Sequence, residues 1–167
     1  GITADAATKK RIKDTLDWIE KDLQGKAAQK AVWRVMITHH PYTDVFNNRY
    51  IVPLAERCGV NLVIGGHLHY YIKSVSVDPR VGARTVYVCQ GSTQDPEAAF
   101  SGRCEEKRLL GDFPEVAAMG KNNYGQLEIT PEALDYRLYG FQPDGGEKLV
   151  DTIHLTPEEP KVKLSEI

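Results

Sequence analysis

Four of the five histidines of this chain fall in two short clusters, Thr38-His39-His40-Pro41 and Gly65-Gly66-His67-Leu68-His69. Imidazole nitrogens are good ligands for zinc, iron and similar transition-metal ions, and a bound ion of this kind can activate water for hydrolysis. Because histidine is scarce in the rest of the chain, the two clusters predict a metal site.

Each cluster directly follows a short apolar run that is typical of a buried strand. Val35-Met36-Ile37 precedes the first cluster and Leu62-Val63-Ile64 precedes the second. The amphipathic stretch 49–59 between them predicts a helix, with Pro53 near its first turn and Gly59 at its end. A strand–helix–strand unit of this kind is almost always right-handed, with parallel strands. Both clusters should therefore emerge at one carboxyl edge of a sheet, where open α/β sheets place their ligands.

The spacing within each cluster indicates which histidines share the site. His67 and His69 have i, i+2 spacing and project to the same side of extended backbone, whereas the adjacent His39 and His40 point opposite ways. We therefore assign His39, His67 and His69 to the metal. His40 receives a catalytic assignment, either as a phosphate contact or as a residue that orients a ligand. His154 is interpreted as a surface or hydrogen-bonded core residue.

These motifs and their order resemble the calcineurin-like metallophosphoesterases, most closely the purple-acid-phosphatase-like branch. The resemblance is carried by Gly66-His67-Leu68-His69 after an apolar strand and by the upstream Thr38-His39-His40-Pro41. It implies half of an α/β/β/α sandwich, a βαβ unit followed by mostly antiparallel strands. Further segments that fit the family are residues 15–23, 86–92, 123–129 and 150–153.

The resemblance implies a two-metal hydrolase of phosphate esters. The resemblance implies that the two ions are divided between the two histidines of the second cluster, with His67 on one ion and His69 on the other. His39 would be a ligand of one of these two ions. The expected cofactors are two transition-metal ions, Fe, Zn or Mn, which polarise the phosphoryl oxygens and generate a hydroxide nucleophile. Phosphomonoesters, diesters, nucleotides and phosphoprotein sites all fit as the phosphate ester substrate.

The chain also departs from the family pattern. The DxH, GDxxD and GNH(D/E) motifs of the family's first half do not occur in it. We therefore expect residues 1–156 to be the C-terminal half of the domain, with the missing N-terminal half as its partner and residues 157–167 as a tail or linker. The chain alone should bind metal weakly or not at all and show little activity.

Two residues are candidates for substrate contact. Some relatives carry another histidine shortly after the first motif; here Asn48 stands in the corresponding stretch 44–48 and is the expected substitute. Tyr71 flanks the second cluster and could border a substrate pocket, with packing in the sheet as the alternative.

Composition excludes some classes of function. The chain is 41% hydrophobic and 26% charged, which is ordinary for a globular domain. A net charge of −2 provides no nucleic-acid footprint, and no apolar run is long enough to be a membrane segment. Three cysteines without zinc-type spacing leave disulfide use and the compartment open, and Cys58 and Cys89 are expected in the core.

The remaining elements can be predicted coarsely. Residues 4–24 predict a helix with an apolar stripe, and Trp18 is expected to pack beside it. Residues 91–123 are expected to be a long loop or a disordered segment. The predicted strands are residues 70–77, 84–90, 124–130, 133–139 and 148–155, the last three as an antiparallel meander.

Two alternatives to the two-metal enzyme remain. A mononuclear zinc hydrolase could use only His39, His67 and His69, since three histidines and a water suffice for catalytic zinc. A non-catalytic α/β interaction module would carry the histidines without using them. The metal content tests the first alternative, and replacement of His67 and His69 by alanine in the intact parent enzyme tests the second.

Overall fold

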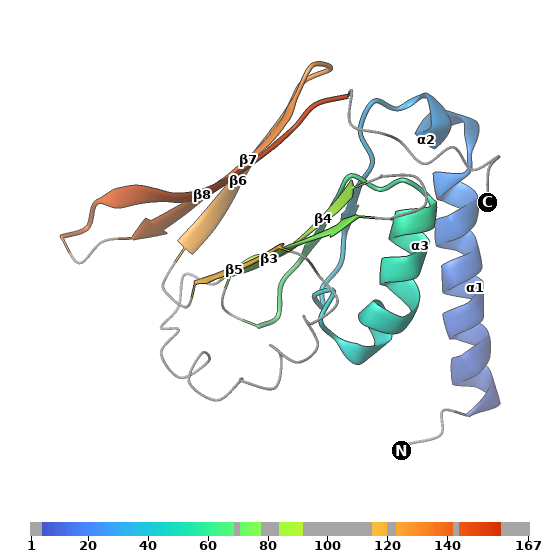
Figure 1. Cartoon of the computed structure of the whole chain (residues 1–167). Coiled ribbons are helices and arrows are strands. Elements are labelled where there is room, and N and C mark those ends of the chain that lie inside the picture. Colours follow the sequence, from blue (N-terminus) through green and yellow to red (C-terminus); the bar gives the residue numbers. More distant parts are fainter. Residues whose placement is uncertain are drawn as a thin grey trace.

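The computed structural model describes residues 5–68, 71–77, 84–91, 115–119, 123–141 and 144–157. Helices, a five-stranded sheet and a three-stranded sheet form three successive layers (Figure 1). One group of buried side chains lies between the helices and the larger sheet, and a second group lies between the two sheets. The predicted α/β class is confirmed.

The five-stranded sheet contains the predicted βαβ unit. Its strands β1 and β2 pair in parallel, as do β2 and β4, whereas β3 is antiparallel to both β4 and β5. In spatial order the strands are β1 (Val35–Ile37), β2 (Leu62–Gly65), β4 (Arg84–Cys89), β3 (Tyr71–Val77) and β5 (Glu115–Met119). The parallel pairing of β1 with β2 is what carries both histidine clusters to the same edge of the sheet.

The crossover between β1 and β2 is helical, as its amphipathic sequence predicts. A π-helical turn, η1 (Asn47–Ile51), runs into α3 (Val52–Arg57), with Pro53 in the first turn, where its missing N–H is tolerated. Gly59 follows with a φ of 64°, a left-handed conformation that glycine adopts at little cost. The glycine thus ends the helix where the sequence predicts.

The inner strands β2 and β4 are buried on both faces, which explains their continuous apolar sequences. Leu62 and Val86 point into the core between the two sheets, whereas Val63 and Tyr87 point into the core beneath the helices. Cys89 at the end of β4 is buried as expected, and so is Cys58, whose thiol pKa is raised by burial. Cys104 lies outside the described residues.

The helix layer begins with α1 (Ala6–Leu23), which matches the predicted helix over residues 4–24. Asp5 is its N-cap and accepts a hydrogen bond from the Thr8 backbone N–H at 2.7 Å. Trp18 does not pack as expected: it is 64% exposed, because the residues of the apolar stripe, and not Trp18, lie on the face of the helix turned to the protein. Among the described helices none is long and apolar enough to span a membrane.

A short second helix follows α1 directly, and an ion pair joins α1 to α3. Gly25 ends α1 and serves as the N-cap of the short α2 (Lys26–Lys30), which the sequence analysis did not predict. The guanidinium of Arg57 in α3 donates to both carboxylate oxygens of Glu20 in α1, at 3.1 and 3.0 Å. Figure 1 shows α1 and α3 side by side on the same face of the five-stranded sheet.

The second sheet is the predicted antiparallel meander of β6 (Asn123–Ile129), β7 (Leu134–Phe141) and β8 (Glu147–Leu155). Alternate residues of β7, beginning with Leu134, are buried against the larger sheet, and the residues between them are partly exposed. This alternation is what a sheet covered on one face requires.

One strand lies in the segment that was expected to be a loop. Residues 115–119 form β5 and pair with β3, in register from Tyr71↔Met119 to Val75↔Glu115. Their local pattern does not alternate between apolar and polar residues, so the strand is defined by the hydrogen bonds that β3 offers. The rest of residues 91–123, apart from Gly91 and Asn123, lies outside the described parts of the chain, as do residues 158–167.

Candidate metal centre

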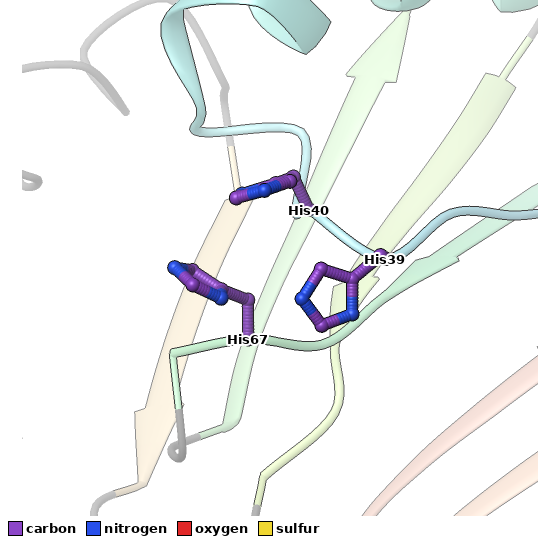
Figure 2. A group of neighbouring side chains, drawn as sticks. All are labelled: His39, His40 and His67. Carbon is purple, nitrogen blue, oxygen red and sulfur yellow. The ribbon is translucent and has the colours of Figure 1, made fainter.

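Three histidines meet at the carboxyl edge of the larger sheet. His39 and His40 follow β1, His67 follows β2, and their side chains lie beside one another (Figure 2). One ring nitrogen from each lies within 4.8 Å of the others. The ring centroids are 4.3 Å apart for His40 and His67, 5.2 Å for His39 and His67, and 5.0 Å for His39 and His40. The parallel strands therefore bring together two loops that are about thirty residues apart in the sequence.

The expectation that His39 and His40 point opposite ways is wrong. It assumed extended backbone, but β1 ends at Ile37 and the two histidines lie in a bend, so both rings join the cluster. His67 is not extended either: its φ is 72°, in the left-handed region that is unusual for a residue with a side chain. The i, i+2 argument for His67 and His69 therefore does not apply, and His69 itself lies outside the described residues.

Hydrogen bonds fix the first histidine loop from both sides. The Thr38 hydroxyl and the Asn47 side-chain amide each donate to the His40 carbonyl oxygen, both at 2.6 Å. Asp44 accepts hydrogen bonds at Oδ1 from the backbone N–H groups of Phe46 and Asn47, at 2.9 and 3.3 Å. The sequence patterns did not identify Asn47 and Asp44 as supports of the site. For Asp44 a signal exists, because an aspartate just before a helix is a recognisable N-cap.

The second loop is tied to the first and to the sheet. The Gly66 backbone N–H donates to the His39 carbonyl at 3.0 Å, which joins the two loops directly. The Gln90 N–H donates to the Gly65 carbonyl at 2.7 Å, and the Cys89 thiol donates to the Gly66 carbonyl at 3.3 Å. The two carbonyls that precede His67 therefore accept hydrogen bonds from residues at the end of β4, and these bonds hold the loop in place.

A small cavity of about 160 Å³ adjoins the histidines; its lining residues are His40, Pro41, Thr43, Asp44, His67 and Leu68. The side chain of Thr43 is 3% exposed, and its hydroxyl finds no hydrogen-bond partner among the residues that the structure describes. Asp44 Oδ2 lies 4.0 Å from His40 Nδ1. The cavity thus combines two imidazoles with a carboxylate and a buried hydroxyl.

The other candidate residues lie elsewhere. Tyr71 is 1% exposed, packs between the two sheets and donates its hydroxyl to Asp151 Oδ2 at 2.9 Å; burial and the Asp151 carboxylate raise its pKa, so the phenol stays protonated. Asn48 is partly exposed on η1 and does not line the cavity beside the histidines. His154 is exposed on the second sheet, with Nδ1 2.7 Å from Asp135 Oδ1, which agrees with the first of its two interpretations, a surface residue.

The three imidazoles suit a single borderline transition-metal ion. Zinc bound tetrahedrally at about 2.0–2.1 Å from each nitrogen sets its ligand atoms about 3.4 Å apart. The three rings are exposed and their nitrogens lie within 4.8 Å of one another, so side-chain rotation can bring them to this spacing. Within the described part of the chain the cluster includes no carboxylate, which makes it a poor site for Mg²⁺ or Ca²⁺.

Part of the chain resembles a known family of proteins. Residues 3–71 match the family model of the calcineurin-like phosphoesterases, whose members hydrolyse phosphate esters and generally bind divalent metal ions. The matched segment is less than half of the chain, but it contains α1, the βαβ unit and all three clustered histidines. No curated protein gives a significant match to the chain. The mixed parallel and antiparallel α/β architecture is consistent with a metallophosphoesterase-type fold.

Proposed function

We propose that this chain forms part of a metal-dependent phosphoric ester hydrolase. The observation that carries the proposal is the convergence of His39, His40 and His67 at one sheet edge, within the segment that matches the calcineurin-like phosphoesterase model. His39 and His67 would hold the ion, with His40 beside them. A metal ion bound there would polarise a phosphoryl oxygen and lower the pKa of a bound water. Because all three imidazoles are exposed, the ion's remaining positions would be open to water and phosphate.

We further propose that the site is completed to a two-metal centre of the purple-acid-phosphatase-like kind. The motifs that favour this branch are Thr38-His39-His40-Pro41 and Gly66-His67-Leu68-His69, with His69 as a further ligand. Imidazoles alone leave the charge of two close cations uncompensated, so bridging carboxylates are required. The DxH, GDxxD and GNH(D/E) motifs are absent from this sequence. The carboxylates should therefore come from an N-terminal half of the same domain, outside these 167 residues.

A mononuclear zinc hydrolase is the second candidate. Three imidazoles within 4.8 Å of one another, and no carboxylate among them in the described residues, are the ligand set of a single catalytic zinc ion with an open fourth position. The ligands in this case are His39, His40 and His67, in place of the set with His69 that the sequence suggests.

Zinc titration of the chain, followed by competition with a chromophoric chelator, tests both candidates. The two-metal proposal expects weak binding of at most one ion by the chain alone and no hydrolysis of p-nitrophenyl phosphate. The full-length polypeptide should then bind two ions and hydrolyse the ester. His67→Ala should abolish that hydrolysis, whereas His154→Ala, a matched replacement of a histidine bound to Asp135 on the second sheet, should leave it unchanged.

The outcomes separate the candidates. Hydrolysis by the chain alone with one bound zinc ion favours the mononuclear enzyme. Two tightly bound ions and hydrolysis by the chain alone contradict the need for a second half. Unchanged activity of the full-length His67→Ala variant contradicts the hydrolase site itself and leaves the non-catalytic module.

A further inference from the structure

We infer that Asp44 is a positioning residue that orients the imidazole of His40 towards the metal centre. The inference rests on the proposed function only for the identity of that centre. Asp44 Oδ2 lies 4.0 Å from His40 Nδ1, and both residues line the cavity that His67 also lines. The distance exceeds a hydrogen bond, but the His40 side chain is 48% exposed and has room to turn towards the carboxylate.

The Asp44 carboxylate is held in place by its other oxygen. Oδ1 accepts from the backbone N–H groups of Phe46 and Asn47 and so caps the helical segment that follows. Oδ2 is the oxygen that remains for His40. Asn47 also donates its side-chain amide to the His40 carbonyl, so one residue anchors both members of the pair. The loop thus fixes the carboxylate and the backbone of His40, and only the His40 imidazole has to turn to complete the pair.

The chemistry of imidazole gives this pairing a consequence. A neutral imidazole carries one N–H and one lone pair, and the hydrogen bond made by one nitrogen decides which nitrogen can bind a metal. A carboxylate facing Nδ1 holds the proton there and leaves the lone pair on Nε2. A carboxylate that orients a metal-binding histidine in this way commonly strengthens metal binding by about 10- to 100-fold. Asp44 thereby prepares His40 to serve as a further ligand beside His39 and His67, and not only as the phosphate contact or orienting residue that the sequence predicts.

The variant that isolates this role is Asp44→Asn. It keeps an oxygen for the helix cap, since asparagine is as good an N-cap as aspartate. It places an amide nitrogen, which is a donor, where Oδ2 faced His40. Asp135→Asn is the matched control, because Asp135 pairs with His154 at 2.7 Å on the second sheet, away from the clustered histidines.

The first measurement is the ¹⁵N spectrum of the imidazoles in the metal-free chain, at about pH 8.5, which is about two units above the ordinary pKa of a free imidazole. We expect His40 to carry its proton on Nδ1 in the wild-type chain and on Nε2 in Asp44→Asn. The Asp135→Asn control should change only the signals of His154. The same His40 tautomer in the wild-type chain and in Asp44→Asn overturns the inference.

The second measurement is the affinity for Co²⁺ alone, followed by its visible absorption. Asp44→Asn should weaken binding about 10-fold without lowering the unfolding temperature. In a His40→Ala background the same substitution should have no further effect, because Asp44 acts through His40. Equal affinity of Asp44→Asn and the wild-type chain, or an undiminished loss in the His40→Ala background, overturns the inference. Failure of the proposed function shows differently, as a full-length polypeptide that hydrolyses no phosphate ester while the His40 tautomer still depends on Asp44.

Discussion

Gly65, at the end of β2, lies in direct contact with Pro41 of the first histidine loop. A Cβ atom at position 65 would come within 2.6 Å of the Pro41 Cα and 2.9 Å of the His40 carbonyl oxygen. Both of these are backbone atoms and cannot move aside as the end of a flexible side chain could. The absence of a side chain at Gly65 is therefore a condition for the two histidine loops to meet.

The first prediction follows from this contact. Gly65→Ala should force the loops apart, lower the free energy of unfolding by about 1–3 kcal/mol and weaken Zn²⁺ binding. The matched control is Gly66→Ala, whose added Cβ would meet only the His39 carbonyl, at an ordinary 3.7 Å. Urea unfolding and zinc titration of both variants test the prediction. Equal effects of the two substitutions would contradict it.

The left-handed backbone of His67 supplies the second prediction. With φ at 72°, any residue that carries a Cβ is strained there, whereas glycine is not. His67→Gly should therefore be about 1 kcal/mol more stable than His67→Ala, although both lose the imidazole and its metal affinity. At His40, which has no positive φ, the order should reverse and alanine should be the more stable replacement. Denaturation curves for the four variants test the expected reversal.

The third prediction concerns the buried hydroxyl of Thr43. A buried hydroxyl without a partner costs about 1–3 kcal/mol, so Thr43→Val, which removes it at nearly constant shape, should raise the free energy of unfolding. Thr85 is the control, since it is equally buried but donates to the Val60 carbonyl at 3.0 Å. Thr85→Val should destabilise the protein by about 1 kcal/mol. Destabilisation by Thr43→Val would mean that its hydroxyl has a partner in solution.

The sequence predicts which sheet edge carries the histidines, but it does not predict the direction in which each imidazole points. Two apolar runs, a crossover helix that ends at a glycine and the right-handed crossover rule predict that the two histidine loops share an edge. Only the second run forms the buried strand that was expected, because β1 is the edge strand of the sheet and its Ile37 is 77% exposed. The direction of each ring depends on contacts between distant residues, which no local pattern contains. The bend at His39 and His40 is held by Asn47, and the left-handed His67 comes two residues after Gly65, which lies against Pro41. Extended backbone was the wrong assumption at both places.

Tyr71 illustrates the same limit, because its position beside the second cluster in sequence says nothing about which face of β3 it occupies. It points away from the cavity lined by His40 and His67, into the core between the sheets. There its hydroxyl meets Asp151 of β8. Only the pairing of β3 with its neighbours decides this orientation.

The fourth prediction concerns the polar link between the two sheets. Asp151 on β8 accepts hydrogen bonds from the Tyr71 hydroxyl at 2.9 Å and from the Lys73 ammonium at 2.8 Å. The side chains of Asp151 and Lys73 are each about four-fifths buried. Asp151→Ala leaves the buried Lys73 charge without this partner and should lower the free energy of unfolding by about 3 kcal/mol. Tyr71→Phe removes one hydrogen bond and should lower it by about 1 kcal/mol. Glu128→Ala, which breaks the more exposed pair with Arg137, should cost less than about 1 kcal/mol. Zinc affinity should stay unchanged in all three variants; a loss of affinity in Tyr71→Phe would instead give Tyr71 a role at the metal centre.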